Sequence, residues 1–251
     1  WTTPVITDVQ DVAHLRVPDP AHAGRMPVLI EAARLAMERV GDRRFVLANI
    51  DSGPFNLACT LMEMSNALMV LKDRPGDLRT IMDFCSEVTI AYGTGMAKSG
   101  CHGVQFGESV VSLIGRKNFE DVVWPFIYLV IKELKKLDLY VFLHVCGDST
   151  PIFDLLVHSG ADCLEFDSQV DIAWAKQQAG TRIALKGNIN TTDFISKSVD
   201  GITDDCRHAI EAAKHGGGYI LCGGCEVPAA TPDDILFAVR RSVDLFGRYD
   251  H

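Results

Sequence analysis

Two short segments of the chain carry residues that commonly bind metals. His144 and Cys146 are separated by one residue, and Cys222 and Cys225 flank a pair of glycines. Residues two apart on a strand project to the same side, so the imidazole and the Cys146 thiol should point together. Both groups are good zinc ligands. With one further cysteine they would form a Cys₂His set with an open fourth position, the arrangement of catalytic zinc.

The choice between the two later cysteines decides what kind of site this is. Cys222 falls inside the apolar run of residues 218–222, whereas Cys225 lies beyond it in the following loop. Alternation along the strand favours Cys225 as the ligand, and Cys222 stays as the alternative. Binding by both would give a closed, structural Cys₃His site. A Cys-x-x-Cys redox motif is less favoured, because residues 226–228 separate the pair from the next helical pattern.

The elements that must position these residues follow an alternating pattern. Strands are expected over residues 44–51, 103–108, 140–146, 163–167, 182–189 and 218–222. Helices are expected near residues 21–40, 55–72, 76–99, 118–137, 150–159, 170–179, 203–216 and 232–247. Strands that alternate with helices predict βαβ units and a parallel sheet. The pattern therefore predicts an α/β fold, either a barrel or an open doubly wound sheet.

All of the expected strands become polar at their carboxyl ends. The polar residues there are Asn49, Asp51, Glu108, His144, Cys146, Asp148, Asp167, Asn188, Asn190, Cys222, Cys225 and Glu226. Active sites of α/β barrels lie at this face, and those of open sheets lie at the same edge. We therefore expect an active site there. The alternative is that strand ends are polar only because they meet solvent.

The composition is that of an ordinary globular domain. The chain has 251 residues, of which 47% are hydrophobic and 23% charged, with a net charge of −9. Without a basic stripe, nucleic acid is not an expected partner. No apolar run reaches the roughly 18 residues of a membrane span, and the first residues show no signal peptide. The eight cysteines form no dense framework, so we expect reduced thiols and a cytoplasmic protein.

At these residues the sequence resembles the uroporphyrinogen decarboxylase superfamily, and within it the corrinoid-dependent methyltransferases, of which the methylcobamide:coenzyme M enzymes are the best known. The matching segments are residues 143–167, 183–194 and 216–235, with a weaker match over 45–58. The combination of H-x-C with G-C-E is typical of the zinc-binding branch. The resemblance implies a TIM-type (β/α)8 barrel in which His144, Cys146 and Cys225 bind Zn²⁺.

The resemblance also bears on domain organisation. Only six strands are expected where a closed barrel has eight, and the segment 1–19 resembles a loop. The family's first quarter has no counterpart in this chain, which indicates a barrel that lacks its first strands. We therefore expect residues 1–251 to form a single (β/α)-barrel domain, with 1–43 as an N-terminal loop and helix.

The activity implied by the resemblance is methyl transfer between a corrinoid, carried by a partner protein, and a zinc-activated small thiol such as coenzyme M. Zinc lowers the pKa of a bound thiol, and the thiolate is the nucleophile. One alternative is the reverse direction, in which zinc activates a methylated small molecule, an ether or amine, for transfer to the corrinoid. Another is a porphyrinogen decarboxylase, although its arginine-rich N-terminal motif is absent.

Other strand-end residues are expected to support this chemistry. Metal ligands are normally oriented by hydrogen-bonding neighbours, and the residues expected in that role are Glu108, Asp148 and Asp167. We assign Glu108 and Asp167 as catalytic residues, with Glu108 as an alternative fourth zinc ligand. Asp51 and Asn188 are expected to bind the substrate, and Lys186 is expected to pair with an acid inside the sheet.

Overall fold

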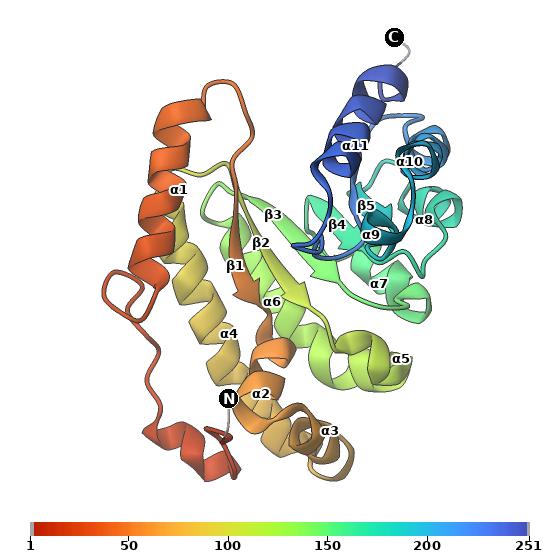
Figure 1. The fold of residues 1–251 in the computed structure, drawn as a ribbon. Coiled ribbons are helices and arrows are strands. Elements are labelled where there is room, and N and C mark those ends of the chain that lie inside the picture. Colours follow the sequence, from red (N-terminus) through yellow and green to blue (C-terminus); the bar gives the residue numbers. More distant parts are fainter. Residues whose placement is uncertain (1–2, 250–251) are drawn as a thin grey trace. The chain divides into compact units, whose positions relative to one another are not determined.

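The computed structural model describes residues 3–249 and divides the chain into two compact units. The first unit comprises Trp1–Leu143 with Ser159–Ala161, and the second comprises His144–His158 with Asp162–His251. In each unit the order of the strands follows their order in the chain (Figure 1). The strand β3 (Tyr140–Val145) begins in the first unit and ends in the second.

The first unit contains the parallel strands β1 and β2 and most of β3, together with helices that precede and follow them. Its elements are η1 (Val9–His14), α1 (Met26–Val40), β1 (Leu47–Ser52), α2 (Pro54–Met62), α3 (Met64–Asp73), α4 (Pro75–Ala97), β2 (Gly103–Glu108), η2 (Val111–Leu113), α5 (Gly115–Asn118), η3 (Phe119–Val123) and α6 (Trp124–Lys135). Apolar residues recur at helical spacing in α4, where Leu78, Ile81, Met82 and Cys85 are buried. This face of α4 contributes to the core beside β1 and β2.

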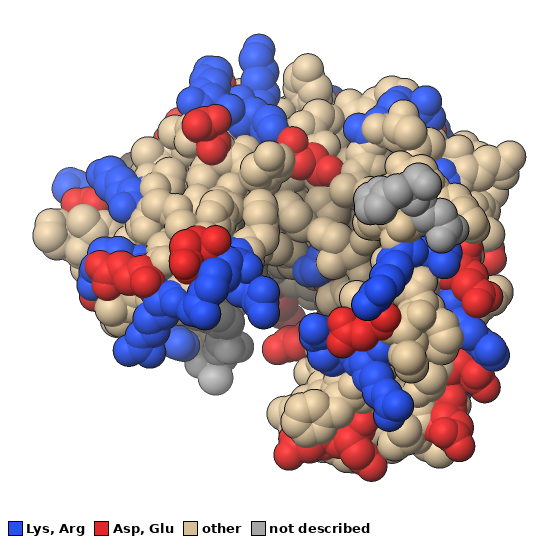
Figure 2. Space-filling model, turned by 90° about the horizontal axis from the view of Figure 1, so that it is seen from above, with Lys and Arg blue, Asp and Glu red and all other residues tan. Residues whose placement is uncertain are grey.

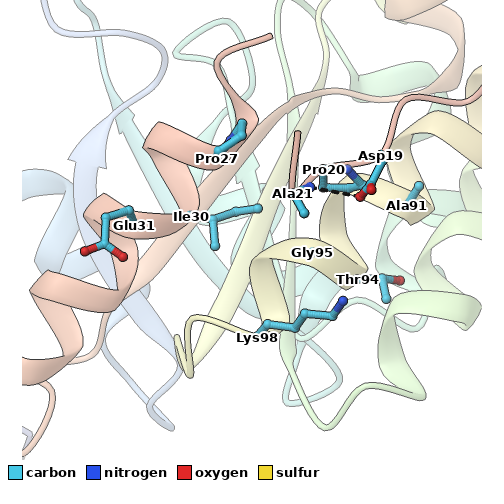
Figure 3. Close-up of a pocket in the computed structure, with 10 residues that line it drawn as sticks. All are labelled: Asp19, Pro20, Ala21, Pro27, Ile30, Glu31, Ala91, Thr94, Gly95 and Lys98. Carbon is cyan, nitrogen blue, oxygen red and sulfur yellow. Dashed lines mark hydrogen bonds between the residues drawn. The ribbon is translucent and has the colours of Figure 1, made fainter. Parts of the chain in front are cut away.

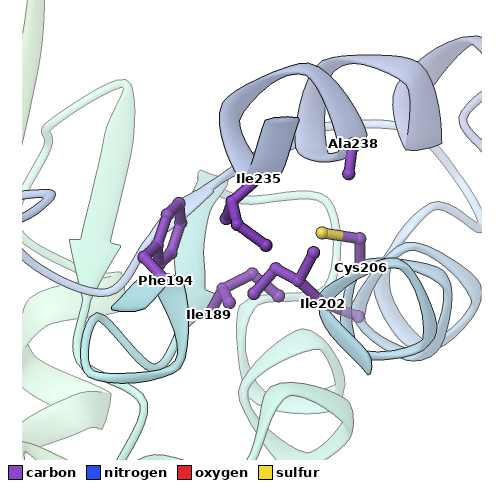
Figure 4. Close-up of a cluster of buried hydrophobic side chains, with 7 residues drawn as sticks. Ile189, Phe194, Ile202, Cys206, Ile235 and Ala238 are labelled. Carbon is purple, nitrogen blue, oxygen red and sulfur yellow. The ribbon is translucent and has the colours of Figure 1, made fainter. Parts of the chain in front are cut away.

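The second unit contains the end of β3 and three further parallel strands. Its elements are η4 (Thr150–Ile152), α7 (Phe153–Val157), β4 (Cys163–Phe166), α8 (Ile172–Ala179), β5 (Ala184–Ile189), α9 (Asp193–Ser196), α10 (Val199–Ala213), β6 (Tyr219–Gly223) and α11 (Asp233–Phe246). β4 pairs with β5 and β5 with β6. A buried apolar cluster joins β5, α9, α10 and α11 through Ile189, Phe194, Ile202, Cys206, Ala209, Ile235 and Ala238 (Figure 4). This cluster fixes the strands that precede the cysteine loop.

The prediction of an α/β fold is confirmed, because residues 3–249 contain six parallel strands that alternate with helices. All six strands lie where the sequence predicted them, with ends shifted by up to three residues. The two compact units do not test the prediction that residues 1–251 form one barrel domain, and it stays a prediction.

Two local predictions were wrong, and one short helix was missed. The single helix expected over 55–72 is broken at Glu63, whose φ of 68° ends α2 and begins α3. Apolar residues keep a helical spacing on both sides of Glu63, so periodicity did not reveal the break. The short helix η1 lies within the segment 1–19 expected to be a loop, with Asp8 as its N-terminal cap. The short helix α9 was not expected at all.

The surface of the described residues mixes both signs of charge. On the face shown in Figure 2, Lys and Arg side chains are interspersed with Asp and Glu side chains. Among residues 3–249, every helix is too short or too polar to cross a lipid bilayer.

Candidate metal centre

The first two residues of the centre come from the end of β3. The side chains of Val141, Leu143 and Val145 are buried in the sheet, whereas His144 and Cys146 are only partly buried. Gly147 follows with a φ of 75°. This left-handed conformation is accessible to glycine at little cost, so the chain turns directly after Cys146.

The third residue comes from the loop after β6. The N–H of Gly224 donates a hydrogen bond to the carbonyl of Ile189 at 2.8 Å. A Cβ atom on Gly224 would lie 2.7 Å from the backbone nitrogen of Ser168, closer than real Cβ contacts. Only glycine therefore allows the backbone of this loop to pack against the chain after β4. This close approach brings Cys225 toward the end of β3.

The three residues converge. One ligand atom from each of His144, Cys146 and Cys225 lies within 4.8 Å of the other two. The two sulfur atoms are 3.3 Å apart and both cysteines are free thiols. Cys222 lies elsewhere, with its sulfur 3.9 Å from Oε1 of Glu165. The structure thus brings together the three residues selected from the sequence and separates Cys222 from them.

The chemistry of this donor set fits a metal such as zinc. Burial lowers the pKa of His144, and the nearby Glu165 offsets this only in part, so the ring is neutral and a nitrogen lone pair is available for a metal. Burial and the neighbouring Cys225 raise the pKa of the Cys146 thiol. A bound cation reverses that balance, because its charge favours the thiolate over the thiol.

Asp167 lies directly beside this group. Its Oδ2 accepts hydrogen bonds from the Gly147 N–H at 3.0 Å and from the Cys146 thiol at 3.6 Å. Its Oδ1 accepts from Ser168 and from the Gln169 N–H. Burial alone would raise the pKa of Asp167, but these hydrogen bonds outweigh it and lower the pKa below its usual value. Asp167 is therefore an anion that orients both Cys146 and the turn at Gly147.

Asn188 supports the same loop from β5. Its buried amide nitrogen donates to the carbonyls of Asp167 at 3.2 Å and Val170 at 2.7 Å. The amide therefore holds the backbone on both sides of the turn after β4. Asp148, by contrast, is exposed, and its Oδ1 accepts from the N–H of Thr150. The substrate-binding role expected for Asn188 stays a prediction.

Glu108, in the first unit, has a different environment. It is completely buried, and its two oxygens accept hydrogen bonds from the N–H groups of Phe55 at 3.1 Å and Asn56 at 2.9 Å. A Cβ on Gly53 would lie 2.3 Å from Oε1, so the helix start closes around the carboxyl. Burial raises the pKa of Glu108 to about 8, although both hydrogen bonds act in the opposite direction. Glu108 anchors the N-terminus of α2, and its catalytic role stays a prediction.

Asp51 and Glu165 differ in how they relate to the sequence prediction: the first was predicted and the second was not. Asp51 is exposed at the end of β1, with a φ of 69° and its N–H bonded to Oδ1 of Asn49; its role in substrate binding stays a prediction. Glu165 was not singled out from the sequence, yet it is buried in β4 and lies 3.1 Å from Nζ of Lys186 and 3.6 Å from Nδ1 of His144. Glu165 could have been found from the sequence, because a charged residue inside an otherwise apolar strand is unusual unless it is paired.

Fold and site together define an α/β protein that presents a Cys₂His group at the carboxyl ends of parallel strands. The family described as uroporphyrinogen decarboxylase (URO-D) matches residues 1–245, so the chain belongs to this family. The resemblance noted from the sequence is thereby confirmed.

Relatives in this family carry two different activities in their names. The chain is 24% identical over 232 residues to methylcobamide:CoM methyltransferase MtbA of Methanosarcina acetivorans, covering 91% of this chain and 66% of that protein. It is 23% identical to uroporphyrinogen decarboxylase of Coxiella burnetii, covering 96% of this chain and 68% of that protein. The chain spans 60–66% of the length of its methyltransferase relatives from Methanosarcina acetivorans and Methanosarcina mazei.

A solved structure supports the fold assignment. The structure titled "methyltransferase from Methanosarcina mazei" superposes with a TM-score of 0.85 at 23% identity, covering 94% of this chain and 69% of that one. The predicted TIM-type barrel fold is thereby confirmed. The described residues 3–249 hold six of the eight strands of a closed barrel.

Proposed function

We propose that this chain is a zinc-dependent methyltransferase that moves a methyl group between a corrinoid, carried by a separate protein, and a small thiol. The observation that supports it best is the convergence of His144, Cys146 and Cys225. The presence of methylcobamide:CoM methyltransferases among the relatives supports it independently.

Each residue of the group has a defined task in this proposal. His144, Cys146 and Cys225 would hold the zinc ion and leave a fourth position for the substrate sulfur. When bound there, zinc supplies the positive charge that keeps a thiol in its nucleophilic thiolate form. Asp167 fixes Cys146 and the adjoining turn through its hydrogen bonds. Asn188 holds the loop that carries Asp167, so the ligands are oriented before the substrate binds.

The thiol pair favours methyl transfer over porphyrinogen decarboxylation. Cys146 and Cys225 face each other at 3.3 Å and are partly exposed. Soft sulfur ligands suit a metal that binds another sulfur. Decarboxylation instead needs cationic groups for several substrate carboxylates, and the residue next to this thiol pair is the anion Asp167. We also propose a cytoplasmic location, because all eight cysteines are free thiols.

The test is a metal analysis combined with a methyl-transfer assay. The purified protein should contain about one zinc per chain. With methylcobalamin as donor and 2-mercaptoethanesulfonate or another small thiol as acceptor, it should demethylate the corrinoid, as followed by absorbance. Cys146→Ala should lose both properties, whereas Cys163→Ala, a control at a buried cysteine of β4, should keep both. A folded protein that binds no zinc would refute the proposal.

A further inference from the structure

The buried carboxyl of Glu165 lies at the centre of a network behind the proposed metal ligands. Glu165 is 5% exposed, and all four residues of β4 are buried. A buried carboxylate is costly unless charged or polar groups compensate it. Its neighbours therefore indicate what it is there to do.

The first neighbour is a lysine on the adjacent strand. Glu165 and Lys186 are register partners between β4 and β5, and Nζ of Lys186 lies 3.1 Å from Oε2. The ammonium group compensates the carboxylate and holds its position. Oε1 faces the thiol of Cys222 at 3.9 Å. The carboxylate is thus fixed from two sides by strands β5 and β6.

The second neighbour is the imidazole of His144. Nδ1 of this ring lies 3.6 Å from Oε2 of Glu165. Within the described residues Nδ1 is buried without a hydrogen-bond partner, whereas Oε2 is already paired with Nζ of Lys186. Buried polar atoms in folded proteins are nearly always hydrogen-bonded, so a buried ring nitrogen that faces a carboxylate oxygen without a hydrogen bond requires an explanation. The separation is slightly longer than a hydrogen bond. A hydrogen bond would require the ring and the carboxylate to approach each other by a few tenths of an ångström.

We propose that Glu165 is the positioning residue for His144 and that Lys186 holds Glu165 in place for this purpose. Glu165 accepts the Nδ1–H of the ring, which selects the Nδ1–H tautomer and leaves the Nε2 lone pair for the metal. This inference rests on the proposed function, because it assigns His144 as a metal ligand. Carboxylates that accept the free N–H of a metal-bound histidine commonly contribute to affinity in this way.

The network predicts a graded effect on metal affinity. Glu165→Gln keeps the size of the side chain but weakens the acceptor and removes the charge, and it should weaken zinc binding by about 10–100-fold. Lys186→Met leaves Glu165 in place without its cation, so the weakening should be smaller. An exposed carboxyl on α10 provides the matched control, since Glu211→Gln removes the same charge at a distant surface position and should stay within about twofold of wild type.

The experiment is a competition titration of zinc against a chromogenic chelator. It is combined with ¹H–¹⁵N spectra of the histidine side chains in the zinc-loaded protein. The signal of His144 is identified as the one that is absent from the spectrum of His144→Gln. Wild type should show His144 as the Nδ1–H tautomer with Nε2 bound to zinc. Glu165→Gln should lose affinity and change the His144 ring signals, which a merely structural role would not change selectively.

The outcomes separate the two proposals. If wild type binds no zinc, the proposed function fails. If wild type binds zinc but Glu165→Gln matches it within about twofold with unchanged His144 signals, the role of Glu165 is refuted and the metal centre stands. Should Glu165→Gln fail to fold, the double variant Glu165→Gln/Lys186→Met removes both buried charges together and is tested instead. Wild-type affinity in that folded double variant would equally refute the inference.

Discussion

Two buried glutamates, one in each unit, show how differently the same side chain is used. Glu108 in β2 is completely buried and Glu165 in β4 is 5% exposed. Both oxygens of Glu108 accept from backbone N–H groups at the start of α2. Within the described residues 3–249, the oxygens of Glu165 face the side chains of Lys186, His144 and Cys222. The two glutamates have the same side chain and are both buried, so what distinguishes them is the groups that their oxygens contact.

The cysteines repeat this contrast. Cys59 and Cys85 of the first unit are buried, and burial raises the pKa of both thiols. Cys146 and Cys225 are partly exposed and face each other. A thiol sealed in a core behaves as a small apolar side chain, whereas two partly exposed thiols beside an imidazole could together hold a metal ion. A polar side chain that contacts backbone or core atoms contributes to the stability of the fold. A polar side chain that faces other polar side chains, some of them without a hydrogen bond, is available for chemistry.

The largest expected effect separates Cys222 in β6 from Cys225 in the loop that follows it. Cys225→Ala should reduce the zinc content from about one per chain to almost none, because two ligands do not hold zinc tightly. Cys222→Ala should leave it close to one, because this sulfur lies beside Glu165 and outside the ligand group. Mass spectrometry of the metals in both purified variants measures this. Equal zinc loss in both would show a closed Cys₃His site and break the comparison.

The next effect concerns the anchoring role of Glu108. Glu108→Ala leaves two buried N–H groups of α2 without acceptors and creates a cavity, so the free energy of unfolding should fall by about 2–4 kcal/mol. Zinc content per folded chain should not change. The exposed Glu120, which pairs with Arg116 at 3.6 Å, serves as control, and Glu120→Ala should cost less than about 1 kcal/mol. Urea unfolding measures both, and equal losses would contradict the anchoring role.

The sequence was sufficient to predict the strands and the convergence of His144, Cys146 and Cys225, and the reasons are local. His144 and Cys146 are two residues apart on a strand, so their common direction follows from strand geometry. Cys225 required only that parallel strands end at one edge of the sheet. The break at Glu63 was not predictable, because the apolar period continues across it and only the backbone conformation changes.

The sequence could not predict which groups the buried glutamates contact. Glu108 and Glu165 both lie in apolar strands, and nothing in the sequence tells which one meets backbone N–H groups. That depends on the start of α2 closing around Glu108, more than fifty residues earlier in the chain. The pairing of Glu165 with Lys186 depends on the register between β4 and β5. A shift of one residue would have placed Lys186 on the other face.

The smallest expected effect is a pH dependence contributed by Glu108, the glutamate whose oxygens accept from backbone N–H groups. Burial raises the pKa of Glu108 from 4.5 to about 8, so between these values the folded chain binds a proton that the unfolded chain has released. The stability contributed by this proton is complete below pH 4.5 and is lost as pH rises toward 8, with a slope of at most about 1.4 kcal/mol per pH unit. Unfolding of wild type and Glu108→Gln in urea between pH 5 and 9, taken as a difference, isolates this one carboxyl from the histidines. The advantage of wild type over the variant should shrink as pH rises and then level off. A difference that stays constant across this range would mean that Glu108 is ionised in the folded chain, held as an anion by the α2 N–H groups.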